Sequence, residues 1–121
     1  MKLIIHTDGG ARGNPGPAAI GVVIESGDNP ERKNKEVVAF GTYIGETTNN
    51  VAEYMAVVEA MKAVKKLGRD FTIAFILDST LVVNKLNGVF KVKDARLRQL
   101  LLQVRMLEQE VGGSITYTSV R

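Results

Sequence analysis

The sequence predicts an α/β fold in which helices pack on a mixed five-stranded sheet. Three β-rich runs come first, separated by Gly, Pro and Asn residues that favour turns. A helical pattern, an almost wholly apolar run, two more helical patterns and a last alternating run then follow. Since 121 residues suit one domain, we expect a single domain over residues 1–121.

The three N-terminal strands are expected over residues 3–7, 18–25 and 36–44. They are rich in β-branched residues and end at polar or glycine-rich segments. Residues 9–17 contain too much Gly and Pro for a helix and should form a loop, and residues 26–35 should form a hairpin turn. The three strands are therefore expected to make an antiparallel meander.

A long helix and a buried strand are expected in the middle of the chain. Residues 50–67 have helical periodicity, good capping residues precede them, and Gly68 ends the helix. Residues 71–77 are nearly all apolar, as in a strand that is buried on both faces within a parallel pair. The sheet should thus combine antiparallel and parallel strands.

The C-terminal part is expected to hold two helices and a strand. Ser79 can cap a short helix over residues 80–86. Asp94 can cap a second helix, in which apolar residues recur at helical spacing until a glycine pair ends it. Residues 114–120 then alternate as the last strand.

Composition excludes several classes of protein. The absence of cysteine excludes disulfides and thiolate metal sites. No apolar run approaches the roughly 20 residues that span a bilayer, so we expect no membrane partner. The N-terminus enters a strand at once, without the basic and small-residue pattern of a signal peptide. We therefore expect a cytoplasmic protein.

Positive charge gathers in one segment. The net charge is only +3, but residues 85–98 contain five cations and the single acid Asp94. The segment is either a solvated face or a patch that faces phosphates. The mild basic excess is compatible with a polyanionic partner.

Asp8 and Asp78 share a placement, because each directly follows an apolar run expected to be a strand. Ligands of open sheets bind beyond the carboxyl ends of the strands. If the two strands are adjacent and parallel, the two carboxylates are neighbours. The alternative is that Asp8 opens a turn and Asp78 precedes a helix cap.

Glu53 is an acid on the inner side of its expected helix. It lies roughly 160° around the helix from the middle of the charged, solvent-facing stripe. The alternative is a capping box, in which Asn50 caps the helix and Glu53 occupies its third position.

These three acids together predict a metal site. Three carboxylates at one sheet edge repel one another unless a cation lies among them. Oxygen-only ligands suit Mg²⁺ or Mn²⁺ rather than Zn²⁺. Such a site suits attack of a metal-activated water on a phosphodiester, so we expect a protein that acts on nucleic-acid backbone.

The glycine-rich segment 9–17 matches neither a dinucleotide-binding fingerprint nor a P-loop. It offers backbone N–H groups near Asp8, where a nucleic-acid strand can approach closely. Asn14, Asn49 and Asn50 can read 2′-hydroxyl groups and minor-groove edges. Turn and cap chemistry is the alternative role for all three.

Several motifs in order resemble the type 1 ribonuclease H family across essentially the whole chain. The pieces that carry the resemblance are Thr7-Asp8-Gly9-Gly10, Gly13-Asn14-Pro15-Gly16-Pro17, Thr47-Thr48-Asn49-Asn50-Val51-Ala52-Glu53-Tyr54, Asp78-Ser79, Leu81-Val82-Val83-Asn84 and Leu86-Asn87-Gly88. The resemblance implies a ribonuclease H-like fold and endonucleolytic cleavage of the RNA strand of RNA–DNA hybrids with two metal ions. It also implies that Asp8, Glu53 and Asp78 are catalytic metal ligands.

The resemblance implies a set of substrate-binding residues as well. Those expected to contact the RNA strand are Gly9, Gly10, Asn14 and Asn50. Those expected to hold the DNA phosphate or the groove between the strands are Thr48, Asn49 and Asn14. Lys91 and Lys93 match the family's basic substrate-facing residues more loosely. The short segment after Gly88 and the absence of Trp indicate the compact form, without a basic protrusion.

The chain departs from the family at its C-terminal end. Family members continue past the last strand into a helix that carries a fourth metal-ligating aspartate, whereas this sequence stops at Arg121. We therefore expect three ligands instead of four and an apolar sheet surface without its helix. The family is monomeric, but such a surface would favour self-association. The alternatives to a nuclease are a hybrid-binding module without turnover and a self-associating fragment.

Overall fold

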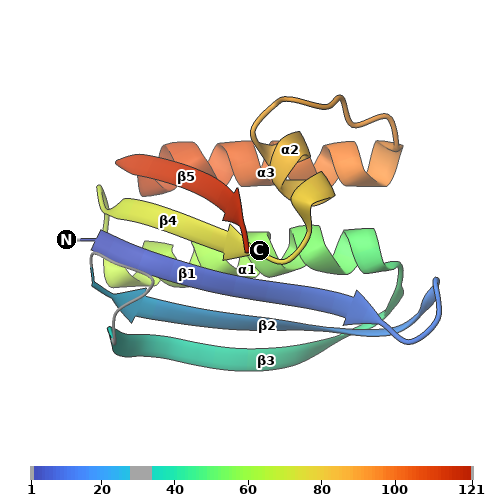
Figure 1. Cartoon of the computed structure of the whole chain (residues 1–121), viewed down its shortest axis with the longest axis horizontal. Helices are drawn as coiled ribbons and strands as arrows, with labels where there is room; N and C mark the ends of the chain where they lie inside the picture. The colour runs from blue at the N-terminus through green and yellow to red at the C-terminus, as the bar shows by residue number, and fades with distance from the viewer. Residues whose placement is uncertain (1, 28–33, 121) are drawn as a thin grey trace.

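Five strands and three helices follow one another in the predicted order in residues 2–27 and 34–120, which a computed structural model describes (Figure 1). The elements are β1 (Lys2–Ala11), β2 (Gly16–Ser26), β3 (Lys35–Thr47), α1 (Asn49–Leu67), β4 (Thr72–Leu77), α2 (Thr80–Leu86), α3 (Ala95–Val111) and β5 (Ser114–Ser119). The two helix caps predicted from the sequence, Ser79 and Asp94, are also confirmed.

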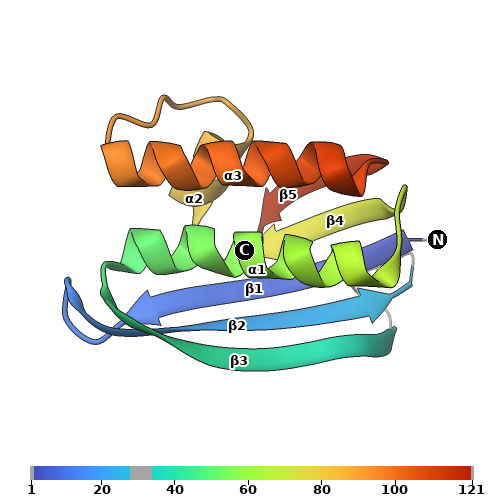
Figure 2. The same ribbon diagram turned by 180° about the vertical axis from the view of Figure 1, so that it is seen from behind.

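All five strands form one mixed sheet in the order β3-β2-β1-β4-β5. β1 pairs with β2 and β2 with β3 in antiparallel fashion, whereas β4 runs parallel to both β1 and β5. α1 and α3 lie against one face of the sheet (Figure 2). The opposite face carries no helix in the part of the chain that the structure describes (Figure 1). The predicted α/β class with a mixed five-stranded sheet is therefore confirmed.

The core lies between the sheet and these two helices. Leu3 and Ile5 of β1, Phe75 of β4, Val57 of α1 and Val104 of α3 are all buried in one apolar cluster. The Phe75 ring also stacks on a tyrosine of β5, with ring centroids 5.2 Å apart. This packing holds α1 across β1 and thereby sets where the first turn of α1 lies.

The first two strands are longer than predicted, and the predicted loop over residues 9–17 is wrong at both ends. β1 continues through Gly9, Gly10 and Ala11, which pair with Ile20, Ala19 and Ala18 of β2. Only residues 12–15 form the turn. The strands are longer because each forms backbone hydrogen bonds with its hairpin partner. The local Gly and Pro content disfavours a strand, but this pairing outweighs it.

β3 also extends beyond its predicted range of 36–44. In its pairing with β2, Gly45 lies opposite Ala18, whereas Tyr43 lies opposite the next residue, Ala19. Ile44 is therefore the extra residue of a β-bulge. Gly45 has φ +86°, which a side chain would disfavour. Residues 28–33 of the predicted turn lie outside the described residues. No helix within the described ranges is long and apolar enough to cross a membrane.

Thr48 caps α1, and the capping box predicted as an alternative for Glu53 is wrong. The Thr48 hydroxyl accepts a hydrogen bond from the Val51 backbone nitrogen at 3.3 Å, and α1 begins at Asn49. With Thr48 as the cap, Glu53 stands beyond the third position, where a capping box needs it. Its carboxylate is therefore not used at the helix end.

Replacing Thr48 by alanine should lower the free energy of unfolding by about 1 kcal/mol, because one amide of the first turn loses its acceptor. Urea denaturation followed by circular dichroism would measure the change. Thr80→Ala is the matched control, since Thr80 is exposed and Ser79 is the cap of its helix. A Thr48→Ala variant as stable as the wild type would contradict the assignment of the cap.

Candidate active site

Asp8 and Asp78 lie side by side where β4 ends and the neighbouring strand β1 continues. The parallel pairing of β1 and β4 ends at Thr7 opposite Leu77, and β1 then continues alone on that side to Ala11. Asp8 follows Thr7 on β1 and Asp78 follows the last residue of β4, so the two are neighbours, as predicted. The prediction that Asp8 ends its strand is wrong, because β2 continues to pair with β1 beyond it.

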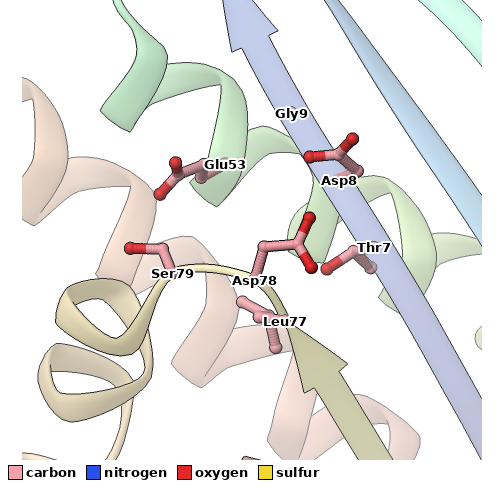
Figure 3. A pocket seen from close by; sticks show the side chains of 7 residues that line it. All are labelled: Thr7, Asp8, Gly9, Glu53, Leu77, Asp78 and Ser79. Carbon is pink, nitrogen blue, oxygen red and sulfur yellow. The ribbon is translucent and has the colours of Figure 1, made fainter. Parts of the chain in front are cut away.

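Glu53 extends from α1 toward the same end of β4. The three acids line one small cavity of about 10 Å³, which is room for about one water molecule. The lining residues are Thr7, Asp8, Gly9, Glu53, Leu77, Asp78 and Ser79. Figure 3 shows the Asp78 carboxylate between Asp8 and Thr7, whereas the Glu53 carboxylate points toward Ser79. The inward orientation predicted for Glu53 is confirmed.

The cavity disfavours the ionised form of Glu53. Burial raises the pKa of Glu53 above its ordinary value, a hydrogen bond from Ser79 opposes that rise, and the charges of Asp8 and Asp78 add to it. The Glu53 Oε2 atom is one of two buried side-chain oxygens without a hydrogen-bond partner in the described residues. An unpaired, partly desolvated carboxylate oxygen beside two other acids is costly unless a cation compensates it.

The donor chemistry of this cavity fits a hard divalent cation. Asp8, Glu53 and Asp78 offer only oxygen donors, and one of these donors is the unpartnered Glu53 Oε2. Within residues 2–27 and 34–120, however, no three His, Cys, Asp or Glu side chains stand in a group that could hold a metal ion. The predicted metal ligand set therefore stays a prediction.

Asn14 and Asn49 use their side-chain oxygens inside the protein. Asn49 Oδ1 accepts a hydrogen bond from the Ala11 nitrogen at 2.7 Å, and Asn14 Oδ1 accepts one from the Asn49 nitrogen at 3.0 Å. These bonds join the hairpin to the start of α1 over 38 and 35 residues, so they are not the local turn and cap chemistry predicted as the alternative role, and the cap of α1 is Thr48. Both side chains are exposed, so their amide NH₂ groups can still donate to a substrate.

The structure separates the other predicted substrate residues from the acids. Gly10 and Asn49 line a neighbouring groove of about 510 Å³. Lys91 lines a different groove of about 470 Å³ between the segment after α2 and α3. Lys93 and Asn50 are exposed and line neither of these grooves. Of the predicted substrate residues, only Gly9 lies at the acid cavity.

Sequence reasoning missed several residues of these surfaces. Thr7 and Ser79 line the acid cavity, and their positions next to Asp8 and Asp78 are a signal that could have found them. Arg12 and Tyr43 line the groove beside Gly10 and Asn49. Nothing local marks Tyr43, because the bulge in β3 decides which residue stands opposite β2.

The chain is similar to known proteins over most of its length. A model of the RNase H family matches residues 1–111. The chain belongs to the RNase H family. The bifunctional protein Rv2228c of Mycobacterium tuberculosis is 39% identical over 110 residues, which are 91% of this chain and 29% of that protein. Ribonuclease HI of Halobacterium salinarum is 42% identical over 106 residues, which are 88% of this chain and 50% of that protein.

The fold comparison agrees with this family. The crystal structure of LC11-RNase H1 in complex with RNA/DNA hybrid matches with a TM-score of 0.87 and 38% identity, covering 98% of this chain and 84% of that one. The predicted ribonuclease H-like fold is thus confirmed. The chain spans half or less of the length of the two curated relatives that it matches.

Proposed function

We propose that this RNase H family chain is a divalent-metal-dependent endonuclease that hydrolyses the RNA strand of RNA–DNA hybrids. The observation that carries the proposal is the cavity at the end of β4, which Asp8, Glu53 and Asp78 all line and at which the Glu53 Oε2 atom has no hydrogen-bond partner among the described residues. A solved relative of the same fold is in complex with an RNA/DNA hybrid, which supports the substrate class.

Each acid has a distinct part in the proposed site. Asp8 and Asp78 are exposed and present their carboxylates at the surface, where a phosphodiester can approach. Glu53 provides a third carboxylate from the buried side. Bound Mg²⁺ or Mn²⁺, two ions in the family, would activate a water and stabilise the charge that develops on the phosphate. Gly10 and the NH₂ groups of Asn14 and Asn49 lie on the adjoining hairpin and the start of α1, where they can contact the sugar and phosphate groups.

A second candidate is hybrid binding without turnover. It is favoured by the spacing of the acids, since no three of them in the described residues form a group that could hold an ion. The exposed hairpin and the basic segment could bind a hybrid without a complete metal set. Cytoplasmic location and self-association stay predictions.

Cleavage of a labelled RNA–DNA hybrid tests the two candidates directly. The protein is incubated with the hybrid in Mg²⁺, in Mn²⁺ and in EDTA, with double-stranded DNA and single-stranded RNA of the same sequence as controls. The nuclease proposal expects RNA-strand fragments from the hybrid alone, and only with metal. Salt-sensitive hybrid binding without fragments would favour the binding module.

Replacing both Lys91 and Lys93 by alanine should weaken hybrid binding and make it less sensitive to salt. The slope of log affinity against log salt concentration should fall by about one unit for each phosphate contact that a lysine makes in the wild type. Fluorescence anisotropy in EDTA at several salt concentrations measures both quantities. The control is Lys62→Ala with Lys66→Ala, which removes the same charge from the exposed stripe of α1. Equal effects in the two double variants would show that only net charge matters.

A further inference from the structure

Gly9 lies directly against the backbone of α1. A Cβ atom at this position would lie 2.7 Å from the Glu53 nitrogen, and closer still to the carbonyl group of Ala52. Real Cβ atoms essentially never approach other heavy atoms within 3.0 Å. The neighbours here are backbone atoms, which cannot rotate aside as the end of a side chain can. α1 can therefore pack this close to β1 only if residue 9 has no side chain.

This close approach acts on the acid cavity. Gly9 is the neighbour of Asp8 in β1, and the backbone that it touches belongs to Ala52 and to Glu53 itself. Ala52 is fully buried, so this part of α1 also has neighbours on its other sides. Any side chain at position 9 must shift the backbone that carries Glu53 away from the strand that carries Asp8.

Asn49 ties the same part of α1 to the hairpin. It stands four residues, about one helical turn, before Glu53. Its side-chain oxygen accepts a hydrogen bond from the Ala11 nitrogen, two residues beyond Gly9 on β1. Its own backbone nitrogen donates to Asn14 on the turn of that hairpin. Gly9 thus allows the close approach of α1 to β1, and Asn49 maintains it.

We propose that Gly9 and Asn49 are positioning residues, which set how the Glu53 carboxylate stands relative to Asp8 and Asp78 and thereby set the affinity of the site for a divalent metal. The inference rests on the proposed metal-dependent function. It differs from the substrate contacts that the family resemblance implies for both residues, because positioning acts on metal affinity in the absence of any substrate.

The test compares metal binding among single variants without nucleic acid. Mn²⁺ affinity is measured by isothermal titration calorimetry for the wild type, Gly9→Ala and Asn49→Ala. Gly41→Ala is the matched glycine control, since its added Cβ would meet nothing nearer than the Ile20 oxygen at 3.6 Å. Val104→Ala is the stability control, because Val104 is fully buried and does not line the cavity. Thermal melts report on folding, and anisotropy in EDTA reports on hybrid affinity.

Gly9→Ala is expected to lower the Mn²⁺ affinity by about tenfold or more, the range found when groups that orient metal ligands are changed. Asn49→Ala is expected to lower it by roughly threefold, because its hydrogen bond to Ala11 is exposed. Both controls keep the wild-type Mn²⁺ affinity, even where Val104→Ala melts earlier. Hybrid affinity in EDTA is measured separately, so that a lost substrate contact at residue 9 is distinguished from a lower Mn²⁺ affinity.

Folded Gly9→Ala protein with wild-type Mn²⁺ affinity would overturn the inference, and so would an effect confined to hybrid binding. If Gly9→Ala does not fold, Asn49→Ala decides, because it changes an exposed side chain, and an unchanged Mn²⁺ affinity there refutes the proposal. A wild type that neither binds Mn²⁺ nor cleaves hybrid removes the proposed function together with the inference. If the wild type binds Mn²⁺ and cleaves hybrid, and the variants bind Mn²⁺ with the same affinity, only the inference is refuted and the proposed function stands.

Discussion

Replacing Asp8 by asparagine is expected to lower the rate of hybrid cleavage by at least about a thousandfold, equivalent to about 4 kcal/mol in the activation barrier. Asp8 stands on β1 beside Asp78, at the point where β4 ends and the sheet opens. Asparagine keeps the size of the side chain but removes its negative charge, so the proposed metal site loses one of its anionic ligands. Single-turnover cleavage of a labelled hybrid in saturating Mn²⁺ measures the decrease.

The matched control for this variant is Asp70→Asn. Asp70 is an exposed aspartate in the turn after α1, and its φ of 61° is a conformation that asparagine tolerates well. The control should cleave at the wild-type rate. Asp8→Asn protein that is folded and retains cleavage within about threefold of the wild type would refute the role of Asp8 as an essential metal ligand.

Replacing Glu53 by glutamine is expected to have two opposite effects. Cleavage should fall by about a hundredfold or more, because a proposed metal ligand loses its charge. The free energy of unfolding without metal should rise by about 1 kcal/mol at neutral pH, because a partly buried carboxylate with one unpartnered oxygen, beside two other acids, is replaced by a neutral amide. Urea denaturation in EDTA measures the second effect.

The gain in stability from Glu53→Gln should depend on pH in a defined direction. The pKa of Glu53 is raised in the folded protein above its ordinary value of 4.5. The folded state therefore holds the proton more tightly than the unfolded state, and wild-type stability falls as the pH rises from 4.5 through the raised pKa. Below pH 4.5 Glu53 is protonated in both states, so the variant and the wild type should differ little there.

A second glutamate of α1 provides the control for this variant. Glu59 pairs with Lys62 at 3.2 Å on the surface of the helix, so Glu59→Gln should change stability by only a few tenths of a kcal/mol, about the value of such surface pairs. Added Mn²⁺ should stabilise the wild type but not Glu53→Gln. A Glu53→Gln variant less stable than the wild type at neutral pH in EDTA would contradict the electrostatic argument.

Much of the fold could be predicted because its elements have strong local signals. The order of strands and helices, the caps at Ser79 and Asp94 and the parallel strand β4 were all predicted from periodicity and from capping residues. The errors fall in the hairpin after Asp8 and in β3. There the pairing partner, rather than local propensity, decides how long the strand continues.

The candidate site could be predicted only in part, for a related reason. The inward orientation of Glu53 follows from helical geometry, which is a local property. The roles of Asn14 and Asn49 as backbone acceptors depend on how the hairpin meets α1, and no local pattern contains that distance. The position of Lys91 in a separate groove likewise depends on how the segment before α3 packs.

The sequence by itself therefore determined the inward face of Glu53 and the places of Asp8 and Asp78 directly after apolar runs, because helix faces and apolar runs are local properties. Only the tertiary structure decided that β1 continues past Asp8, that β1 and β4 are adjacent and parallel, and that the backbone of α1 lies directly against Gly9. Those features depend on contacts between segments far apart in the chain, which form only when the sheet and its helices pack together. The acid cavity exists because one strand ends where its neighbour continues.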